Sequence, residues 1–139
     1  MKLKIHTDGG ALNNPGPAGI GYLIYLEDGS LYFSEGKAIG TASNNVAEYT
    51  ALVTALTKVN ELIKNGELRD VKSISVFADS ELMIKQINGL YKVKHADMRD
   101  LLFKIRIAEG DLGIPVIYTH VLRDKNAAAD KLVKTSLGR

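Results

Sequence analysis

Hydrophobic and polar residues alternate along three consecutive stretches at the start of the chain, which is the period-two pattern of a strand with one buried face. The first stretch, residues 2–8, ends at Asp8 and is followed by two glycines. The second and third stretches, residues 19–27 and 31–38, are separated by Asp28-Gly29, a typical hairpin turn. The start of the chain therefore predicts a β-meander of three strands, with a loop rich in glycine and proline after the first.

After residue 42 hydrophobic residues recur every three or four positions, which is the period of a helix. The longest such stretch predicts a helix from Ser43 to about Lys64, with Gly66 as its stop signal. Both patterns then recur, and the predicted elements are a strand over 71–79, a short helix to about 88, a helix over 97–109, a strand over 114–120 and a helix over about 126–137. This order, β-β-β-α-β-α-α-β-α, predicts an α/β fold.

Composition limits the possible functions without selecting one. A chain of 139 residues, 45% hydrophobic and 24% charged, is the size of one ordinary domain, so residues 1–139 are expected to form a single domain. No apolar run is long enough for a membrane span, and we expect neither membrane association nor a signal peptide. The absence of cysteine excludes disulfides and thiolate zinc sites and fits a reducing, cytoplasmic location. A net charge of +2 does not by itself indicate a nucleic-acid-binding protein.

Four acidic residues stand at element boundaries where α/β proteins commonly bind ligands. Asp8 and Asp79 close two predicted strands, whereas Glu48 and Asp130 lie near the starts of two predicted helices. Strands joined by helices tend to be parallel neighbours, so Asp8 and Asp79 should lie together beyond the carboxyl ends of their strands. Clustered carboxylates require cations, and oxygen ligands suit Mg²⁺ or Mn²⁺. Two such ions could support an in-line phosphoryl displacement without a protein nucleophile.

Each acid also has an ordinary structural explanation. Glu48 follows Asn45 at the spacing of a helix capping box, so its carboxylate could simply hold a backbone amide. Asp79 could be a helix N-cap, and Asp130 could be a solvent-exposed helix residue. The metal site is favoured because all four positions fit one site.

Several polar residues near these acids suit a phosphate or sugar ligand. Gly9 and Gly10 allow the backbone to approach a bulky anion. Asn44 and Asn45 offer more hydrogen-bonding groups at a helix start than one cap needs. The basic loop over residues 90–95 carries one aromatic residue, and a solvated turn is its alternative interpretation.

The order of these motifs resembles the ribonuclease H type 1 family over the whole chain. Four segments carry the resemblance: Asp8-Gly9-Gly10 followed by Asn14-Pro15-Gly16-Pro17, then Ser43-Asn44-Asn45-Val46-Ala47-Glu48, then Ala78-Asp79-Ser80, and finally His120 ten residues ahead of Asp130. One such motif is weak, but four in order are specific. The resemblance implies a ribonuclease H-like fold with a five-stranded mixed sheet, the first strand central. It also implies hydrolysis of the RNA strand of RNA–DNA hybrids, leaving 5′-phosphate and 3′-hydroxyl ends.

The resemblance further implies how the four acids act. Asp8 would bridge two Mg²⁺ or Mn²⁺ ions. Glu48 and Asp79 would bind one of these ions and position the attacking water. Asp130 would complete the ligand shell of the other ion.

Roles outside the metal site follow from the same resemblance. His120 matches a mobile histidine that assists water activation or product release, with a buried structural role as its alternative. Arg123 could share or replace that histidine. The implied contacts with the hybrid come from Asn14, Asn44 and Asn45 in the minor groove and from Ser43 at a phosphate of the DNA strand.

Three departures from the family pattern limit the analogy. Glu81 stands where a glutamine often contacts the hybrid, so that contact must differ or repel. The chain has no tryptophan, and no long basic handle follows the helix after Asp79. Lys92, Lys94 and His95 are the only substitute, which predicts weaker and more salt-sensitive binding. The third departure is Arg123, which lies in the loop after His120.

Two other functions remain compatible with the residues. A nuclease of the same fold could act on double-stranded RNA or a DNA junction, and an inactive module could bind hybrids without cutting them. The retention of all four acids argues against the inactive module. We expect a monomer with an RNA–DNA hybrid as its ligand and no obligate protein partner.

Overall fold

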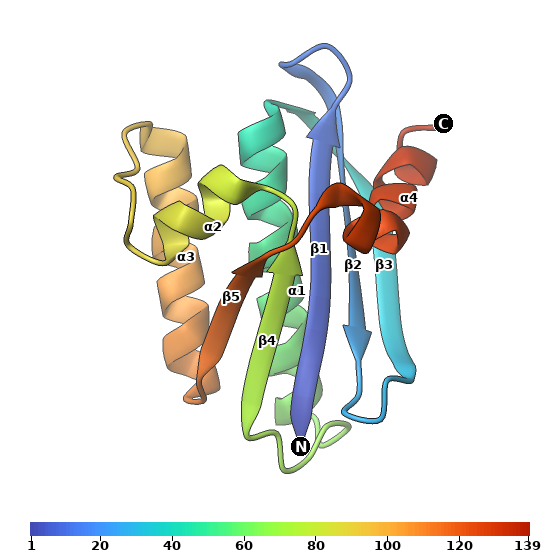
Figure 1. Cartoon of the computed structure of the whole chain (residues 1–139), viewed down its shortest axis with the longest axis vertical. Coiled ribbons are helices and arrows are strands. Elements are labelled where there is room, and N and C mark those ends of the chain that lie inside the picture. Colours follow the sequence, from blue (N-terminus) through green and yellow to red (C-terminus); the bar gives the residue numbers. More distant parts are fainter.

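The computed structural model describes residues 1–139 as a five-stranded mixed sheet with helices on both faces (Figure 1). The strands are β1 (Lys2–Ala11), β2 (Gly16–Tyr25), β3 (Leu31–Ala42), β4 (Ser73–Ala78) and β5 (Val116–His120). Their order across the sheet is β3-β2-β1-β4-β5, so the first strand is central as expected. β1 pairs antiparallel with β2 and parallel with β4, and β4 pairs parallel with β5. The predicted fold class and element order are confirmed.

The meander extends further than the sequence pattern predicts. β1 does not stop at Asp8, because Gly9, Gly10 and Ala11 continue the ladder opposite β2. β3 likewise continues to Ala42, which pairs with Gly16 at the start of β2. The loop between β1 and β2 is therefore only residues 12–15. Hydrogen bonds with the neighbouring strand hold the turn-forming residues Gly9 and Gly10 in extended backbone.

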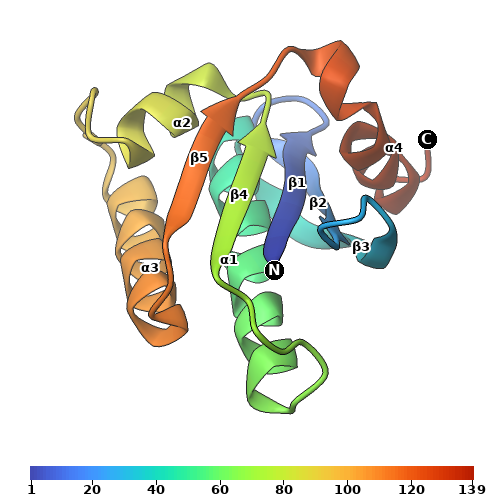
Figure 2. The same cartoon turned by 60° about the horizontal axis from the view of Figure 1, so that its bottom comes forward.

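Three helices cover one face of the sheet and one covers part of the other (Figure 2). The first face carries α1 (Asn44–Lys64), α2 (Glu81–Ile87) and α3 (Ala96–Leu112). The second face carries α4 (Ala127–Ser136), which follows a 3₁₀ turn, η1 (Arg123–Asn126), and lies over β2 and β3. No helix of the chain is both long and apolar enough to cross a membrane.

The core lies between the sheet and the three helices of the first face, with α1 at its centre. Alternate residues of β1, including Leu3 and Ile5, are fully buried against the inner face of α1, which contributes Leu52 and Leu56. Burial of these aliphatic side chains contributes about 1.5–3 kcal/mol each. This packing fixes the position of α1 against the carboxyl end of β1, where Asp8 and Glu48 meet.

Candidate active site

Three of the predicted acids converge at the end of the central strand. Asp8 lies on β1, Glu48 in the first turns of α1, and Asp79 directly after β4. One carboxylate oxygen from each lies within 4.8 Å of the others. The three acids line a cleft of about 390 Å³ beside the carboxyl ends of β1 and β4. The parallel pairing of these two strands explains why residues 71 positions apart in sequence share one site.

Glu48 does not form the capping box that its spacing from Asn45 suggested. The N-cap of α1 is Ser43, whose hydroxyl accepts from the Val46 amide at 3.1 Å. Glu48 is 8% exposed, and its Oε1 accepts a 3.0 Å hydrogen bond from the amide of Gly9. Its second oxygen, Oε2, is buried and accepts no hydrogen bond from a backbone or side-chain N–H or O–H group. A buried carboxylate oxygen in this state requires a cation or a proton.

The electrostatics of the cluster show the same requirement. The pKa of Asp8 is raised from 3.8 to about 7, chiefly by burial, with the hydrogen bond with Glu48 opposing this rise and the charges of Asp79 and Asp130 adding to it. Burial, followed by the hydrogen bond and charge of Asp8, raises the pKa of Glu48 well above 4.5. Without a cation, these two carboxylates therefore resist ionisation at neutral pH. The donor set, all hard oxygens in one small site, fits Mg²⁺ or Mn²⁺.

Asp130 lines the cleft but lies outside the group of three. It projects from the first turn of α4, and its Oδ2 is 2.9 Å from the ammonium of Lys134 one turn later. An i,i+4 ion pair of this kind contributes only about 0.3–0.5 kcal/mol. Asp130 is therefore free to exchange Lys134 for a stronger cation.

Arg123 and His120 have different acidic neighbours. Arg123 lines the cleft, and its Nε is 3.4 Å from Oδ2 of Asp79, although its side chain is 82% exposed. His120 ends β5 and is half-buried, with Nδ1 3.8 Å from Oε2 of Glu81. The structure thus brings Arg123, and not His120, into contact with an acid of the cluster.

Glu81 is neutralised locally rather than left as a free anion. Its carboxylate accepts a 3.0 Å hydrogen bond from Lys85 Nζ, which holds the pKa of Glu81 below its usual value. Lys85 also lies 3.4 Å from the hydroxyl of Tyr91 and over its ring. The unfavourable acid predicted at this position is therefore paired with a base that sequence analysis did not single out.

The predicted asparagines form a connected group at the rim of the cleft. Asn14 Oδ1 accepts from the backbone amide of Asn44 at 2.9 Å, and Asn44 Oδ1 accepts from the amide of Ala11 at 2.8 Å. Both carbonyl oxygens are used internally, so the NH₂ groups of these exposed side chains remain available as donors. Asn45 is also exposed and lines the cleft.

Gly9 and Gly10 line the cleft for different structural reasons. A Cβ on Gly9 would lie 2.3 Å from the backbone carbonyl of Ala47, so Gly9 is needed for the close packing of β1 on α1. A Cβ on Gly10 would meet nothing nearer than Val133 at 3.7 Å. Only Gly10 therefore has space on its cleft side, which is the arrangement expected for close approach of a ligand.

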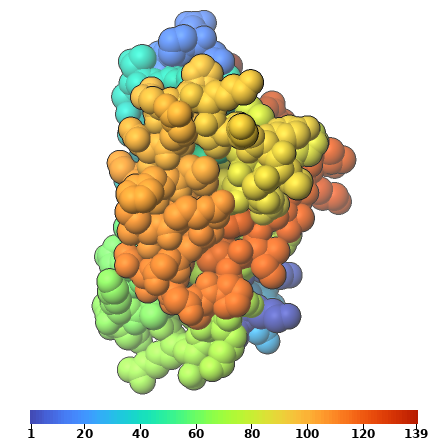
Figure 3. All heavy atoms as spheres, turned by 90° about the vertical axis from the view of Figure 1, so that its left-hand side faces the viewer, coloured from blue at the N-terminus to red at the C-terminus, as the bar shows by residue number.

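Lys92 and Lys94 lie in a separate groove of about 570 Å³ between α2 and α3. The groove also contains Leu90 and Tyr91, both exposed, and it shares Asn45 with the acidic cleft. Figure 3 shows this side of the molecule, on which the loop between the two helices is exposed. The two sites are therefore neighbours on one surface, joined at the start of α1.

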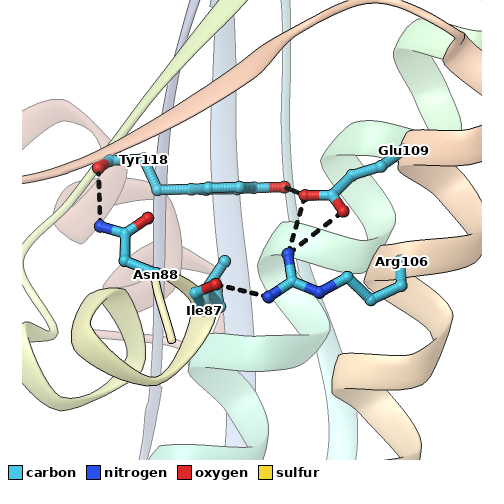
Figure 4. Close-up of polar contacts among 5 residues, drawn as sticks. All are labelled: Ile87, Asn88, Arg106, Glu109 and Tyr118. Atoms are coloured by element: carbon cyan, nitrogen blue, oxygen red, sulfur yellow. Dashed lines mark hydrogen bonds and ion pairs between the residues drawn. The ribbon is translucent and has the colours of Figure 1, made fainter. Parts of the chain in front are cut away.

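A polar network holds the α2 end of this loop in place (Figure 4). The hydroxyl of Tyr118 on β5 donates to Glu109 at 2.6 Å, and Nη1 of Arg106 donates to both oxygens of the same carboxylate. Arg106 also donates to the carbonyl of Ile87, and Asn88 donates to the carbonyl of Tyr118 at 3.2 Å. These contacts tie the end of α2 to α3 and β5.

One buried polar residue of the site, Asn126, was not predicted from the sequence. Its side chain, 2% exposed, donates to the carbonyl of Thr7 at 2.8 Å and to Oδ1 of Asp79 at 3.2 Å. The partners are 119 and 47 positions away in sequence, so no local pattern could indicate these contacts. A lone asparagine four residues before Asp130 was the only available signal.

The sheet order and the acids at the ends of its central strands define a ribonuclease H-like domain. A family model described as reverse transcriptase-like matches residues 6–136. The chain is 32% identical to ribonuclease HI of Halobacterium salinarum over 98% of its length, and 36% identical to a bifunctional protein of Mycobacterium tuberculosis over 99%. It spans 64% and 36% of the length of these two relatives.

Solved structures agree with this assignment. The structure of LC11-RNase H1 in complex with an RNA/DNA hybrid superposes with a TM-score of 0.89 at 38% identity, covering 98% of this chain and 96% of that one. The N-terminal RNase H domain of the M. tuberculosis protein gives a TM-score of 0.86 at 34% identity, covering 99% and 94%. The chain therefore belongs to the ribonuclease H type 1 family.

Proposed function

We propose that the protein is a metal-dependent endonuclease that hydrolyses the RNA strand of RNA–DNA hybrids and leaves 5′-phosphate and 3′-hydroxyl ends. The observation that carries this proposal is the convergence of Asp8, Glu48 and Asp79, with one buried carboxylate oxygen of Glu48 unpartnered. The similarity to LC11-RNase H1, which was solved with a bound hybrid, supports the choice of substrate.

The four acids would hold two Mg²⁺ or Mn²⁺ ions. Asp8 would be shared between them, Glu48 and Asp79 would serve one, and Asp130 would join the other after leaving Lys134. Bound ions of this kind activate water and neutralise charge on the phosphate during in-line displacement. The protein itself supplies preorganised ligands: Gly9 fixes one oxygen of Glu48, and burial of the cluster strengthens its attraction for cations.

The asparagine group would recognise the minor groove of the hybrid. The free NH₂ groups of Asn14 and Asn44 are donors, whereas minor-groove base edges present acceptors and the RNA strand adds 2′-hydroxyl groups. Ser43 uses its oxygen to cap α1, and its O–H remains free to donate to a phosphate. These residues would place the RNA strand over the acids and the DNA strand toward the second groove.

A panel of matched duplexes tests the proposal. Incubation of RNA–DNA, RNA–RNA and DNA–DNA duplexes with Mg²⁺, Mn²⁺ or chelator should give cutting of the RNA strand of the hybrid alone, and only with metal. Cutting of another duplex would assign a different substrate to the same site. Hybrid binding without cutting under any metal condition would identify an inactive binding module.

Removal of the positive charges of the second groove should weaken substrate binding. The double substitution Lys92→Ala with Lys94→Ala should raise KM by roughly 3–10-fold at 0.1 M salt, since each lysine neutralises a phosphate of the DNA strand. The dependence of log KM on log salt concentration should flatten by about 1–2 units.

Steady-state kinetics at several salt concentrations measure this effect. The matched control is Lys64→Ala with Lys72→Ala, which removes two exposed lysines away from both grooves and should leave the salt dependence unchanged. Equal slopes of log KM against log salt concentration for the two double variants would show that the loop is not part of the binding surface.

His120 and Arg123 are expected to contribute to turnover rather than to substrate binding. His120→Ala should lower kcat by roughly 10–100-fold if the histidine transfers a proton, with little change in KM. Arg123→Ala should lower kcat as well, since Arg123 contacts Asp79. Single-turnover rates of both variants and of their combination measure this. An effect from the arginine substitution alone would assign the histidine's role to Arg123.

The monomeric state and the cytoplasmic location stay predictions from the sequence. Neither is needed for the proposed reaction, because all the acids of the site come from one chain.

A further inference from the structure

Asn126 connects three elements that carry acids of the proposed metal site. It ends η1 and directly precedes α4, which bears Asp130. Its Nδ2 reaches the carbonyl of Thr7, the residue before Asp8, and also reaches Oδ1 of Asp79. Although Asn126 stands at the N-cap position of α4, its side chain forms no capping hydrogen bond. The side chain is therefore directed to the acid-bearing strands rather than to its own helix.

The orientation of the Asn126 amide follows from its partners. The carbonyl of Thr7 and the carboxylate of Asp79 are both acceptors, so the NH₂ group must face them, and Oδ1 must face His6. Oδ1 lies 3.0 Å from Nδ1 of His6. Because Oδ1 is only an acceptor, Nδ1 of His6 must carry a hydrogen. The amide can adopt no flipped state without placing its oxygen against two other acceptors.

His6 is itself held rigidly on the outer face of β1. Its ring stacks on Phe77 of β4, with centroids 5.1 Å apart, and meets the edge of Tyr25 on β2 at 5.8 Å. The ring is therefore fixed by the two strands that flank β1. A rigid donor at this position restricts rotation of the Asn126 side chain.

We propose that His6 and Asn126 are positioning residues that orient the Asp79 carboxylate for metal binding. This inference rests on the proposed metal site. The hydrogen bond from Asn126 holds Oδ1 of Asp79, and Oδ2 has only the exposed Arg123 as partner. His6 acts on Asp79 only through Asn126. Partners that orient metal ligands in this way commonly alter metal affinity by about 10–100-fold when they are removed.

Mn²⁺ binding by the protein without nucleic acid tests this inference, with free Mn²⁺ followed by its paramagnetic resonance signal. Asn126→Ala should raise the Kd for Mn²⁺ by about 10-fold. His6→Phe, which keeps an aromatic ring on Phe77 but removes the donor, should raise it by roughly 3-fold. The double variant should match Asn126→Ala, since His6 has no separate route to Asp79.

Kinetics add a readout that a purely structural role would not affect. At limiting Mn²⁺ the Asn126→Ala enzyme should have reduced kcat with unchanged KM for the hybrid, and excess Mn²⁺ should restore kcat. The matched control is Asn88→Ala, which also removes one hydrogen bond from an asparagine to a strand carbonyl but lies away from the acids. Its Kd for Mn²⁺ should equal that of the wild type.

Three results would overturn the inference. The first is a folded Asn126→Ala protein with wild-type Mn²⁺ affinity, and the second is additive losses in the double variant. If Asn126→Ala does not fold, the test rests on His6→Phe. An unchanged Kd for Mn²⁺ in the His6→Phe protein is then the third result. A wild-type protein that neither binds Mn²⁺ nor cuts hybrids would instead contradict the proposed function itself.

Discussion

Asp8→Asn should lower turnover of the hybrid by at least about 10³-fold while raising the stability of the metal-free protein at neutral pH. The loss of activity follows because Asp8 is the acid proposed to be shared by both ions. The gain in stability follows because ionised Asp8 is buried beside Glu48 and has no cation to offset the cost.

The stability effect has a defined pH dependence. The pKa of Asp8 is raised from 3.8 to about 7 in the folded protein, chiefly by burial. Below pH 4 both states hold the proton, and Asp8 costs nothing. Between pH 4 and 7 Asp8 releases its proton only in the unfolded protein, so the free energy of unfolding of the wild type falls as the pH rises. Above pH 7 this loss of stability is complete. The expected difference at pH 8 is on the order of 2–4 kcal/mol.

Urea unfolding in chelator across pH 4–8 measures this difference. Asp100→Asn removes an exposed carboxylate on α3 and serves as the control. Its free energy of unfolding should differ from that of the wild type by the same amount at every pH. A constant stability gap for Asp8→Asn would contradict the account of Asp8 as a buried charge. More than about 1% residual turnover would contradict its role as a metal ligand.

Gly9→Ala should destabilise the fold by roughly 2–4 kcal/mol and abolish measurable cleavage. The added methyl would lie 2.3 Å from the carbonyl of Ala47 and 2.6 Å from the amide of Glu48, so β1 and α1 must separate. Because Gly9 donates to Glu48, that separation also displaces a proposed metal ligand.

Gly10→Ala provides the comparison for this prediction. Its methyl would meet Val133 at 3.7 Å, an ordinary contact, so stability should stay within about 1 kcal/mol of the wild type. Any loss of activity should then appear in KM, because Gly10 faces the cleft. Urea unfolding and steady-state kinetics on both variants separate packing from ligand approach. Equal stability of the two variants would exclude the packing role of Gly9.

The sequence predicted the elements and the acids that end them, because both depend on local spacing. Asp8 and Asp79 were expected together from the parallel-strand rule, and the pairing of β1 with β4 places them so. The prediction from the sequence was wrong where pairing with a neighbouring strand determines the backbone conformation. Gly9 to Ala11 look like a turn, but the ladder with β2 keeps them extended.

Side-chain partners were the least predictable feature. Glu48 had the spacing of a capping box, yet it turns to Gly9 because Ser43 already caps α1. The contacts of Asn126 could not be predicted, because its partners Thr7 and Asp79 lie far away in the sequence. Asp130 fitted the acid series, but the sequence could not show that it pairs with Lys134 and lies outside the group of three.

The polar network around Glu109 makes the α2–α3 connection a modular part of the fold. Arg106 and Asn88 fasten its first end to α3 and to β5, and its second end leads into α3, which packs on α1, so both ends are placed independently of the residues between them. Segments of different length and charge can therefore be carried here without disturbing the acids on β1 and α1. Tightness of substrate capture and speed of the chemistry can thus change separately, both during evolution and by loop grafting.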